Sequence, residues 1–327
     1  MFTISVVIPA KNEETEIRKT LHSVRKHIPP DLLSEIIVID NGSTDATGQV
    51  ARGFGAIVLP QSEGHIGSLR NRGASRATGD LLVFLDADVS LASDWDRGLI
   101  HLQHKTLENP NLITGAWCEI PEQDSWIPRL WHSDTDKRGS VTHIGSGHMI
   151  VPRATFDRIG GFDESLGTGE DYDLCQRALE EGIPVIAIPE FRAFHRGEPQ
   201  VLTAFFRREL WHGMGDGGSM AKILRSNIAL ASLAVASLHG LLILPLISRG
   251  AVPWPVAFVG IGLIFSGVLG AVTVRWGWRS PVRLPARLLL TYLYFWARFA
   301  ALIRAQFLQH SADSPRKSRS RTHADPP

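Results

Sequence analysis

The sequence predicts an α/β fold with a doubly wound, mostly parallel sheet, followed by a C-terminal helical membrane region. Apolar, strand-like runs alternate with helical patterns through the first two thirds of the 327-residue chain. The run Leu81–Leu85 is apolar at every position, as in a central parallel strand that is buried on both faces. Beyond Asn227, long apolar stretches separated by arginines replace this mixed composition. We therefore expect a globular domain at 1–220, a membrane region at 221–310 and a basic, disordered tail at 311–327.

The predicted sheet begins with four strands that are separated by helices. Strands are expected at residues 3–9, 35–40, 56–59 and 81–85. Helices are expected at residues 11–27 and 67–77, and from a cap at Ser43 or Thr44 toward Gly53 and Gly55. Further strands are predicted at 112–118, 148–151 and 184–188, with a helix at 170–181. Sheets of this class bind their ligands at the carboxyl ends of the strands.

The composition limits which classes of partner are expected and indicates the cellular compartment. The net charge is +1 and the basic residues of the first part are dispersed, so a nucleic-acid partner is not expected. Cys118 and Cys175 have neither disulfide nor metal-ligand spacing, which predicts free thiols in a reducing cytosol. The first apolar run, at 4–8, is too short for a secretory signal peptide and is better interpreted as a strand.

Two acidic residues follow the buried run at 81–85. Asp86 and Asp88 flank Ala87 at the carboxyl end of this predicted strand. Carboxylate oxygens suit Mg²⁺ or Mn²⁺, and an ion held by one or two carboxylates commonly takes further ligands from substrate phosphates. Two acids in a loop are also typical of a solvated turn or a helix cap. The pair therefore predicts a metal and nucleotide diphosphate site only if other motifs support it.

Four further motifs accompany the Asp-x-Asp triplet in order. They are SVVIPAKNE at 5–13, VIDNGSTD at 38–45, RNRGA at 70–74 and GED at 169–171. With the triplet, they resemble family 2 glycosyltransferases of the GT-A fold, over roughly the first two thirds of the chain. The resemblance implies transfer of a sugar from a nucleotide diphosphate donor. One departure is Asn41, at a position where the family often carries a second acid.

The resemblance implies which residues hold the base and ribose of the donor. These residues are Pro9, Lys11, Glu13 and Asp40. Asp40 can accept a hydrogen bond from the imino N–H of a uracil-like or guanine base, or it can cap the turn at Gly42 or Ser43. UDP-sugars are the favoured donors, and GDP-sugars and dTDP-sugars are the alternatives.

The donor phosphates are assigned to a helix and a glycine-rich turn. Arg72, rather than Arg70, is expected to bind phosphate from the helix that precedes the metal strand. Gly147, within GSGH at 145–148, would shape the floor of the pocket because glycine permits close backbone approach.

The resemblance also implies the metal ligands. It places the direct metal contact on Asp88 and leaves Asp86 to the ribose or to the surroundings of the metal. His195 could add an imidazole ligand, as a matching histidine does in some related transferases, although a lone histidine is usually structural. The expected cofactor is Mn²⁺ or Mg²⁺.

Catalysis is assigned to Asp171 and its neighbour Glu170, at the start of the predicted helix 170–181. The matching family position makes Asp171 the general base that removes a proton from the acceptor hydroxyl. The alternative is an acid that the helix macrodipole stabilises. The sequence offers no obvious covalent nucleophile, which predicts a single displacement with inversion at the anomeric carbon.

The apolar stretches predict the membrane region. Residues 228–247 and 256–274 are long enough to span a bilayer of about 30 Å. Residues 286–308 carry Arg298 and Arg304 and are expected to lie at the interface instead. Basic residues gather on the outer flanks of the two spans, which predicts a multi-pass inner (plasma) membrane protein with a cytoplasmic catalytic domain. The expected acceptor lies in the lipid bilayer, as a lipid-linked saccharide or a glycolipid.

Other functions remain as alternatives. A polyprenyl-phosphate sugar synthase would use a phosphate acceptor, which is already ionised and needs no base such as Asp171. A catalytically inactive membrane scaffold or nucleotide-sugar sensor would keep the donor site without turnover. A nucleotidyltransferase would carry a glycine-rich, basic loop after the first strand, which is missing here. A transporter would need more spans, and His239 is expected to be packed or interfacial.

Overall fold

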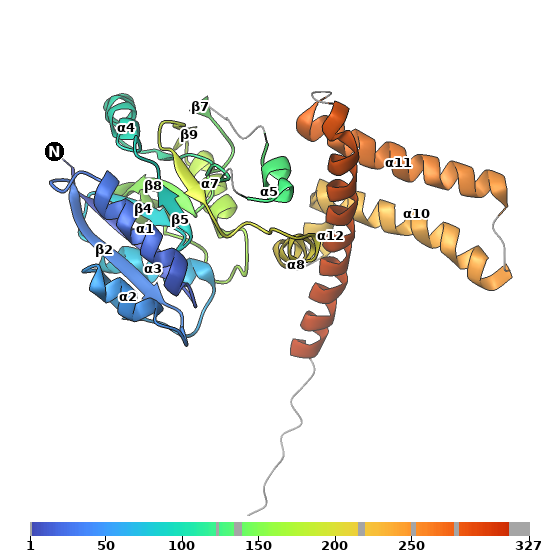
Figure 1. Cartoon of the computed structure of the whole chain (residues 1–327), viewed down its shortest axis with the longest axis horizontal. Coiled ribbons are helices and arrows are strands. Elements are labelled where there is room, and N and C mark those ends of the chain that lie inside the picture. Colours follow the sequence, from blue (N-terminus) through green and yellow to red (C-terminus); the bar gives the residue numbers. More distant parts are fainter. Residues whose placement is uncertain are drawn as a thin grey trace, which may run out of the picture. The chain divides into compact units, whose positions relative to one another are not determined.

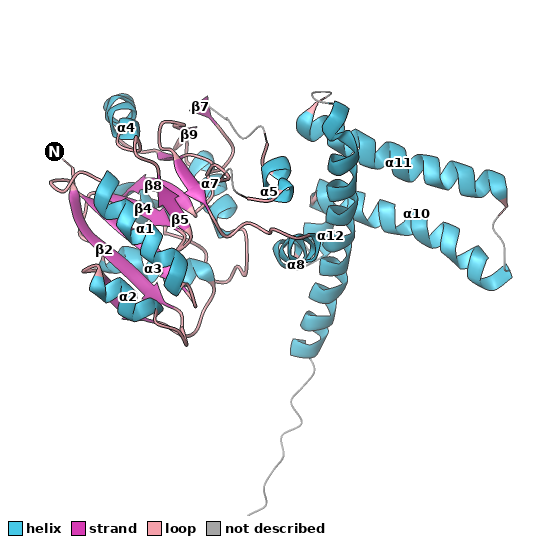
Figure 2. Ribbon diagram, in the orientation of Figure 1, coloured by secondary structure: helices cyan, strands magenta, loops and turns pink. Residues whose placement is uncertain are grey.

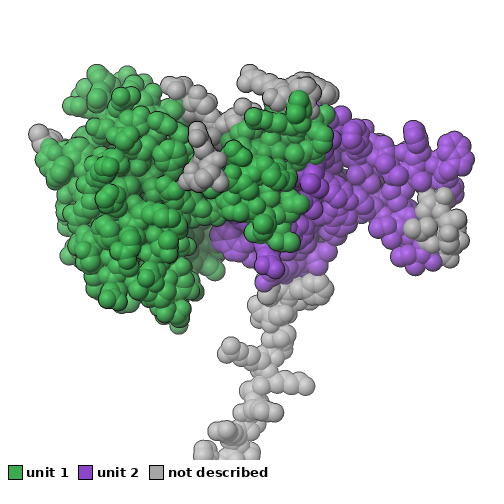
Figure 3. Space-filling model, viewed as in Figure 1, with its two compact units in different colours: residues 1–205, 276–287 green, residues 206–275, 288–327 purple. Residues whose placement is uncertain are grey.

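The computed structural model describes residues 2–121, 124–133, 139–214, 220–249, 253–277 and 281–313. The chain divides into two compact units (Figure 3): residues 1–205 with 276–287 form unit 1, and residues 206–275 with 288–327 form unit 2. Unit 1 carries the sheet and unit 2 is helical. Most of the glycine-rich stretch 213–219 and of the basic tail lies outside the described residues.

Unit 1 is built on a mixed, mostly parallel sheet (Figure 2). Its strands are β1 (Ile4–Ala10), β2 (Leu33–Asp40), β3 (Ile57–Pro60), β4 (Leu81–Leu85), β6 (Ile113–Gly115), β7 (Gly139–Ser140), β8 (His148–Pro152) and β9 (Val185–Ala187). They lie in the order β3-β2-β1-β4-β8-β6-β9-β7. β8 is antiparallel to β4 and β6, and β7 is antiparallel to β9. The predicted strands are therefore confirmed, although the strand expected at 112–118 is limited to three residues.

Helices cover both faces of this sheet (Figure 1). They are α1 (Glu14–His27), α2 (Thr47–Gly53), α3 (Ile66–Arg76), α4 (Arg97–Glu108), α6 (Arg153–Ile159) and α7 (Glu170–Glu180). The short helix α5 (Trp126–Trp131) lies between α4 and α6 in the sequence. Val6 and Ile8 of β1 join the core beneath α1, α2 and α4, and Val7 joins the core beneath α3, α6 and α7. This alternation follows from the two-residue period of a strand with both faces buried.

A second, two-stranded sheet was not predicted. β5 (Val89–Leu91) follows the Asp-x-Asp triplet and pairs antiparallel with β10 (Ala193–His195). Val89 lies opposite His195 in this pairing. The ribbon therefore brings a histidine from late in the chain beside the acids that follow β4.

The predicted cap of α2 was wrong. The helix begins at Thr47, and its N-cap residue is Ala46, whose methyl side chain cannot cap the helix. Ser43 and Thr44 instead bond to Asn12, which has a φ of 56°. The Ser43 hydroxyl accepts from the Asn12 N–H at 3.0 Å, and the Thr44 N–H donates to Asn12 Oδ1 at 2.8 Å. Ser43 and Thr44 thus join the loop after β2 to the loop after β1. Because Asn12 in that loop has a non-helical backbone conformation, α1 begins at Glu14 rather than at residue 11.

Three described helices are long and apolar enough to cross a membrane. They are α10 (Asn227–Arg249), α11 (Trp254–Trp276) and α12 (Leu284–Asp313). Two shorter helices, α8 (Leu202–Gly213) and α9 (Met220–Arg225), precede α10, and a turn of 3-10 helix at Pro281–Arg283 precedes α12. The stretch expected to be interfacial thus also meets the length and composition of a span. In unit 2, His239 of α10 packs on Trp296 and bonds through Nε2 to the Tyr292 hydroxyl at 2.8 Å.

His148 makes the stability of unit 1 sensitive to acid. Its side chain is buried, and its Nε2 accepts a hydrogen bond from Trp95 Nε1 at 2.9 Å. Burial lowers the pKa of His148 from 6.5 to about 4. The unfolded chain therefore takes up a proton at a higher pH than the folded chain does. Folding stability attached to this group is complete above pH 6.5 and is lost as the pH falls toward 4, by about 3 kcal/mol in all.

We expect a His148→Gln variant to show a flatter fall in melting temperature between pH 6.5 and pH 4 than the parent chain, because glutamine does not titrate. Thermal unfolding of the detergent-purified protein at four or five pH values measures this slope. Parallel curves for the two proteins would show that His148 is not responsible.

Candidate functional site

The carboxyl ends of β1, β2 and β4 form one edge of the sheet, and acidic residues gather there. Asp40 ends β2 opposite Ala10 of β1, and Asp86 directly follows β4. The Asp86 N–H donates to the Gly147 carbonyl at 3.1 Å, and the Val89 N–H donates to the Asp86 carbonyl at 3.1 Å. These two bonds fold the triplet into a tight turn between β4 and β5, so both of its carboxylates stay at this edge.

The structure brings Asp86, Asp88 and His195 together. One ligand atom from each lies within 4.8 Å of the others. Two carboxylate oxygens and one imidazole nitrogen are a donor set that divalent ions such as Mn²⁺ accept. The three side chains are only partly exposed, so a bound ion would be held against the protein rather than in open solvent. The described residues therefore fit a divalent metal ion at this place.

His195 is held on both of its ring nitrogens. Nε2 lies 3.2 Å from Asp88 Oδ1, and Nδ1 lies 2.9 Å from Glu198 Oε1. Burial lowers the pKa of His195, but hydrogen bonds and charges from Asp88 and Glu198 outweigh this effect and raise the pKa to about 10. Two carboxylates therefore flank the imidazole, and Nε2 is the ring nitrogen that faces Asp88.

Two glycines allow the metal-site carboxylates to lie against the backbone. A Cβ atom on Gly147 would be 2.5 Å from Asp86 Oδ2, and one on Gly197 would collide with Asp88 Oδ2. Gly147 was expected to shape the pocket, and the structure places it directly under Asp86. Gly197 was missed, and its only signal was its position two residues after His195.

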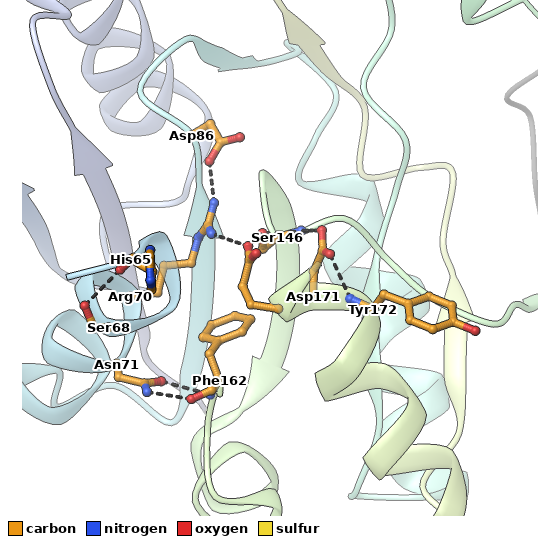
Figure 4. A network of polar contacts seen from close by, with 10 residues as sticks. His65, Ser68, Arg70, Asn71, Asp86, Ser146, Phe162, Asp171 and Tyr172 are labelled. Atoms are coloured by element: carbon orange, nitrogen blue, oxygen red, sulfur yellow. Dashed lines mark hydrogen bonds and ion pairs between the residues drawn. The ribbon is translucent and has the colours of Figure 1, made fainter. Parts of the chain in front are cut away.

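Arg70, not Arg72, is the arginine at the centre of the site (Figure 4). Its side chain is buried between two acids: Nη2 lies 2.6 Å from Asp86 Oδ1, and Nη1 lies 2.7 Å from Glu170 Oε1. Arg72, which was expected to bind phosphate, is exposed and contacts Gln61 Oε1 at 3.5 Å. Arg70 thus links Asp86, which follows β4, to Glu170 at the start of α7.

The two candidate catalytic acids have different surroundings. Glu170 is buried and accepts hydrogen bonds from Arg70 and from the Ser146 hydroxyl, the latter at 2.9 Å. Burial raises the pKa of Glu170, against the opposing charge of Arg70. Asp171 is partly exposed, with Oδ2 accepting from the Ser146 N–H at 3.1 Å and Oδ1 accepting from the Tyr172 N–H at 2.7 Å (Figure 4). Asp171 is therefore the acid that a second substrate can reach.

The residues expected to contact the base and ribose line the edge of the sheet beside Asp86 and Asp88. Pro9 is buried in β1, and Lys11 is exposed just beyond it. Glu13 is partly buried, and burial followed by the charge of Asp88 raises its pKa to about 7. Asp40 Oδ1 accepts from the Ser43 N–H at 2.9 Å, so the turn-capping role is present, and Oδ2 is directed at Gly48.

Two residues of the site had no signal in the sequence. Glu198 is buried and contacts His195 through one oxygen and His132 Nε2, at 3.0 Å, through the other. His132 lies 66 residues before Glu198, just after α5. No spacing rule joins positions this far apart, and neither residue type stands out locally.

Comparison with known proteins identifies relatives along most of the chain. Residues 5–152 match the family model described as Glycosyl transferase family 2, and residues 132–309 match Glycosyl transferase family group 2. The 4,4'-diaponeurosporenoate glycosyltransferase of Staphylococcus aureus is 35% identical over 275 residues, which cover 73% of this chain and 68% of the relative. The pre-mycofactocin glycosyltransferase of Mycobacterium tuberculosis is 26% identical over 83% of this chain, which spans 56% of that longer protein.

A solved structure shows the same fold. The mannosyltransferase PcManGT from Pyrobaculum calidifontis, in complex with GDP-Man and Mn²⁺, superposes with a TM-score of 0.60 at 19% sequence identity. The match covers 94% of this chain and 88% of that one. The predicted GT-A fold with its Asp-x-Asp motif and C-terminal apolar helices is thereby confirmed.

The geometry of Arg70 predicts a large difference between two neighbouring arginines. Replacing Arg70 by glutamine leaves Asp86 and Glu170 close together without a cation, and we expect a loss of about 3–5 kcal/mol in unfolding free energy. The exposed Arg72 is the matched control, with an expected change within about 0.5 kcal/mol for Arg72→Gln. Thermal unfolding should separate the two variants by roughly 10 °C. Equal melting temperatures would show that the buried ion pairs do not stabilise the fold.

Proposed function

The chain is a glycosyltransferase of family 2, and we propose that it transfers a sugar, with inversion, from a nucleotide diphosphate to a hydroxyl group of a membrane-bound acceptor. The observation that carries this proposal is the convergence of Asp86, Asp88 and His195 at the edge where Asp40 and Glu13 also lie. A metal site beside groups that can recognise a base and ribose suits a nucleoside diphosphate. Asp171 stands nearby as a partly exposed base.

Asp88 and His195 would hold a Mn²⁺ or Mg²⁺ ion, with Asp86 beside them. When bound, such an ion neutralises the negative charge that develops on the departing diphosphate. Pro9, Lys11, Glu13 and Asp40 would contact the base and ribose, and the exposed Arg72 remains available to a phosphate. An acceptor oxygen on Asp40 suits the imino N–H of uracil, guanine and thymine, so the donor would be a UDP-, GDP- or dTDP-sugar. Among these we favour a UDP-sugar.

Asp171 would act as the general base. Its Oδ2 is oriented by the Ser146 N–H, and among the described residues no ion pair joins this carboxylate to a cation, whereas Glu170 is paired with Arg70. The acceptor hydroxyl would give its proton to Asp171 while its oxygen forms a bond to the anomeric carbon. The bond from that carbon to the diphosphate oxygen breaks in the same step, which inverts the anomeric centre. We assign Glu170 to positioning, through Arg70, rather than to proton transfer.

The apolar helices support a membrane-bound acceptor. Three of the described helices could cross a bilayer. Lys222 and Arg225 precede the first of them, and Arg283 and Arg287 follow the second. By the positive-inside rule, this distribution favours a multi-pass inner-membrane protein with its catalytic unit in the cytoplasm. A cytoplasmic enzyme anchored in this way would meet a lipid-linked saccharide or a glycolipid. A polyprenyl phosphate is the alternative acceptor, but its ionised oxygen would not require Asp171 as a base.

Two single-atom substitutions separate donor binding from catalysis. We expect Asp88→Asn to weaken binding of the nucleotide with Mn²⁺ by about 100-fold, because a metal ligand loses its charge. Asp171→Asn should leave this affinity within about twofold and lower the transfer rate by about 10²–10⁴. Calorimetric titration with UDP, GDP and dTDP, each with Mn²⁺, measures the affinities and identifies the base.

The binding and transfer measurements together test the metal site, the enzymatic activity and the proposed base. Asp88→Asn binding as tightly as the parent chain would contradict the metal and donor assignment. Nucleotide binding without turnover by the parent chain would instead favour a sugar-nucleotide sensor. Full activity of Asp171→Asn would contradict the role of Asp171 as the general base.

The acceptor and orientation are tested with labelled donor and membranes that contain the protein. We expect label in the lipid extract of inverted vesicles, where the donor reaches the cytoplasmic face, and none with right-side-out vesicles. Asp171→Asn vesicles are the control for other transferases. Label confined to the aqueous fraction would contradict a membrane acceptor, and label from right-side-out vesicles alone would reverse the orientation.

A further inference from the structure

Glu198 joins two histidines through its two carboxylate oxygens. Oε1 lies 2.9 Å from His195 Nδ1, and Oε2 lies 3.0 Å from His132 Nε2. The Glu198 side chain is only 4% exposed, so it is among the least accessible acids of the described residues. A carboxylate withdrawn from water to this degree is retained only when its oxygens are satisfied, and here imidazoles from two separate segments contact them.

The contact with Glu198 decides which ring nitrogen of His195 is free for other partners. An ionised carboxylate only accepts hydrogen bonds, so His195 must carry its proton on Nδ1 toward Glu198. Nε2, on the other side of the ring, lies 3.2 Å from Asp88 Oδ1 and is therefore the ring nitrogen that faces an acid of the Asp86, Asp88 and His195 group. The tautomer that Glu198 selects is thus the one that presents an Nε2 lone pair to a metal.

The loop that carries Glu198 is fixed at both ends. The Arg196 N–H donates to the Asp88 carbonyl at 3.1 Å, which ties the start of the loop to the metal-site turn. Gln200 donates through Nε2 to the Glu198 carbonyl at 2.8 Å and accepts from the Ser125 N–H at 2.7 Å. Ser125 is the N-cap of α5, so this loop and the helix that leads to His132 are held together.

His132 is held by its own neighbours. Trp131, the preceding residue, packs edge-on against Phe205 and Trp276 of the same unit, with ring centroids 4.9 and 5.6 Å away. Ser133, the following residue, accepts a hydrogen bond from Arg287 Nη2 at 3.5 Å. His132 therefore approaches Glu198 from a packed segment and not from a free loop.

We propose that Glu198 and His132 are positioning residues, which orient His195 and fix its tautomer for metal binding through Nε2. This inference rests on the proposed function, because it requires that His195 is a metal ligand. It adds two residues to the site that no motif contains. It also implies that metal affinity depends on the segment after α5, 66 residues away from Glu198 in the sequence.

The test is metal binding itself, followed without any sugar transfer. Mn²⁺ alone is titrated into the detergent-purified full-length chain, and free Mn²⁺ is measured by its electron paramagnetic resonance signal. We expect Glu198→Ala to weaken Mn²⁺ binding by about 10–100-fold. Glu198→Gln should recover part of this loss, because its amide can accept from His195 and donate to His132 without the charge. Glu180→Gln, at the exposed end of α7, is the matched control.

The second substitution examines the outer histidine. His132→Gln should weaken Mn²⁺ binding less than Glu198→Ala does, because glutamine can still donate to Glu198. His101→Gln, on the exposed face of α4, is the control for the loss of a histidine. Circular dichroism and melting curves establish that each variant is folded, and Glu198→Gln keeps the test decisive if Glu198→Ala does not fold.

The outcomes distinguish this inference from the proposed function. Mn²⁺ binding that is lost in Asp88→Asn but unchanged in Glu198→Gln, Glu198→Ala and His132→Gln would overturn the positioning role and leave the proposed function intact. Absence of Mn²⁺ binding by the parent chain would overturn the positioning role, and absence of binding of Mn²⁺ and Mg²⁺ with every nucleotide as well would overturn the proposed function. A graded loss, largest for alanine at 198 and absent in both controls, supports the inference.

Discussion

The site depends on a buried arginine that holds two acids in place. Arg70 lies between Asp86, which follows β4, and Glu170, which begins α7. Without that cation, two partly desolvated carboxylates would repel one another at the edge where the sheet must bind a ligand. The Ser146 hydroxyl bonds to Glu170, and its N–H orients Asp171. The position of Asp171, the proposed base, is therefore coupled to the position of Asp86 through one network of ion pairs and hydrogen bonds.

Much of the fold could be predicted because its signals are local. Fully apolar runs such as Leu81–Leu85 specify strands buried on both faces, and the acids that follow them must lie at the carboxyl edge. The burial of Arg70 could also have been predicted from the sequence. On α3, Leu69, Arg70, Gly73 and Ala74 are buried and share one helical face, whereas Arg72 lies on the opposite face. Helical periodicity, applied to the motif RNRGA, indicates which arginine points inward.

The remaining features depend on contacts between distant segments. β5 and β10 are three residues each, and neither is recognisable as a strand until the other lies beside it. His195 could be suspected as a ligand from its motif, but Glu198 and His132 gain their roles only from the folded chain. The cap of α2 failed for a related reason, since Ser43 and Thr44 found a partner in Asn12, 31 and 32 residues away. Long-range pairing thus decides the parts of the site that local patterns leave open.

We propose that Asp86 and Asp88, after β4, and His195 of β10 form a site for a metal-bound nucleoside diphosphate. The most direct measurement is pulsed electron paramagnetic resonance of Mn²⁺ bound to the full-length chain with the nucleotide that binds it. We expect two couplings on the same ion: one to an imidazole ¹⁴N, absent in His195→Gln, and one to ³¹P of the diphosphate. A spectrum with the phosphorus coupling of the nucleotide but no protein nitrogen, or with neither coupling, would contradict it.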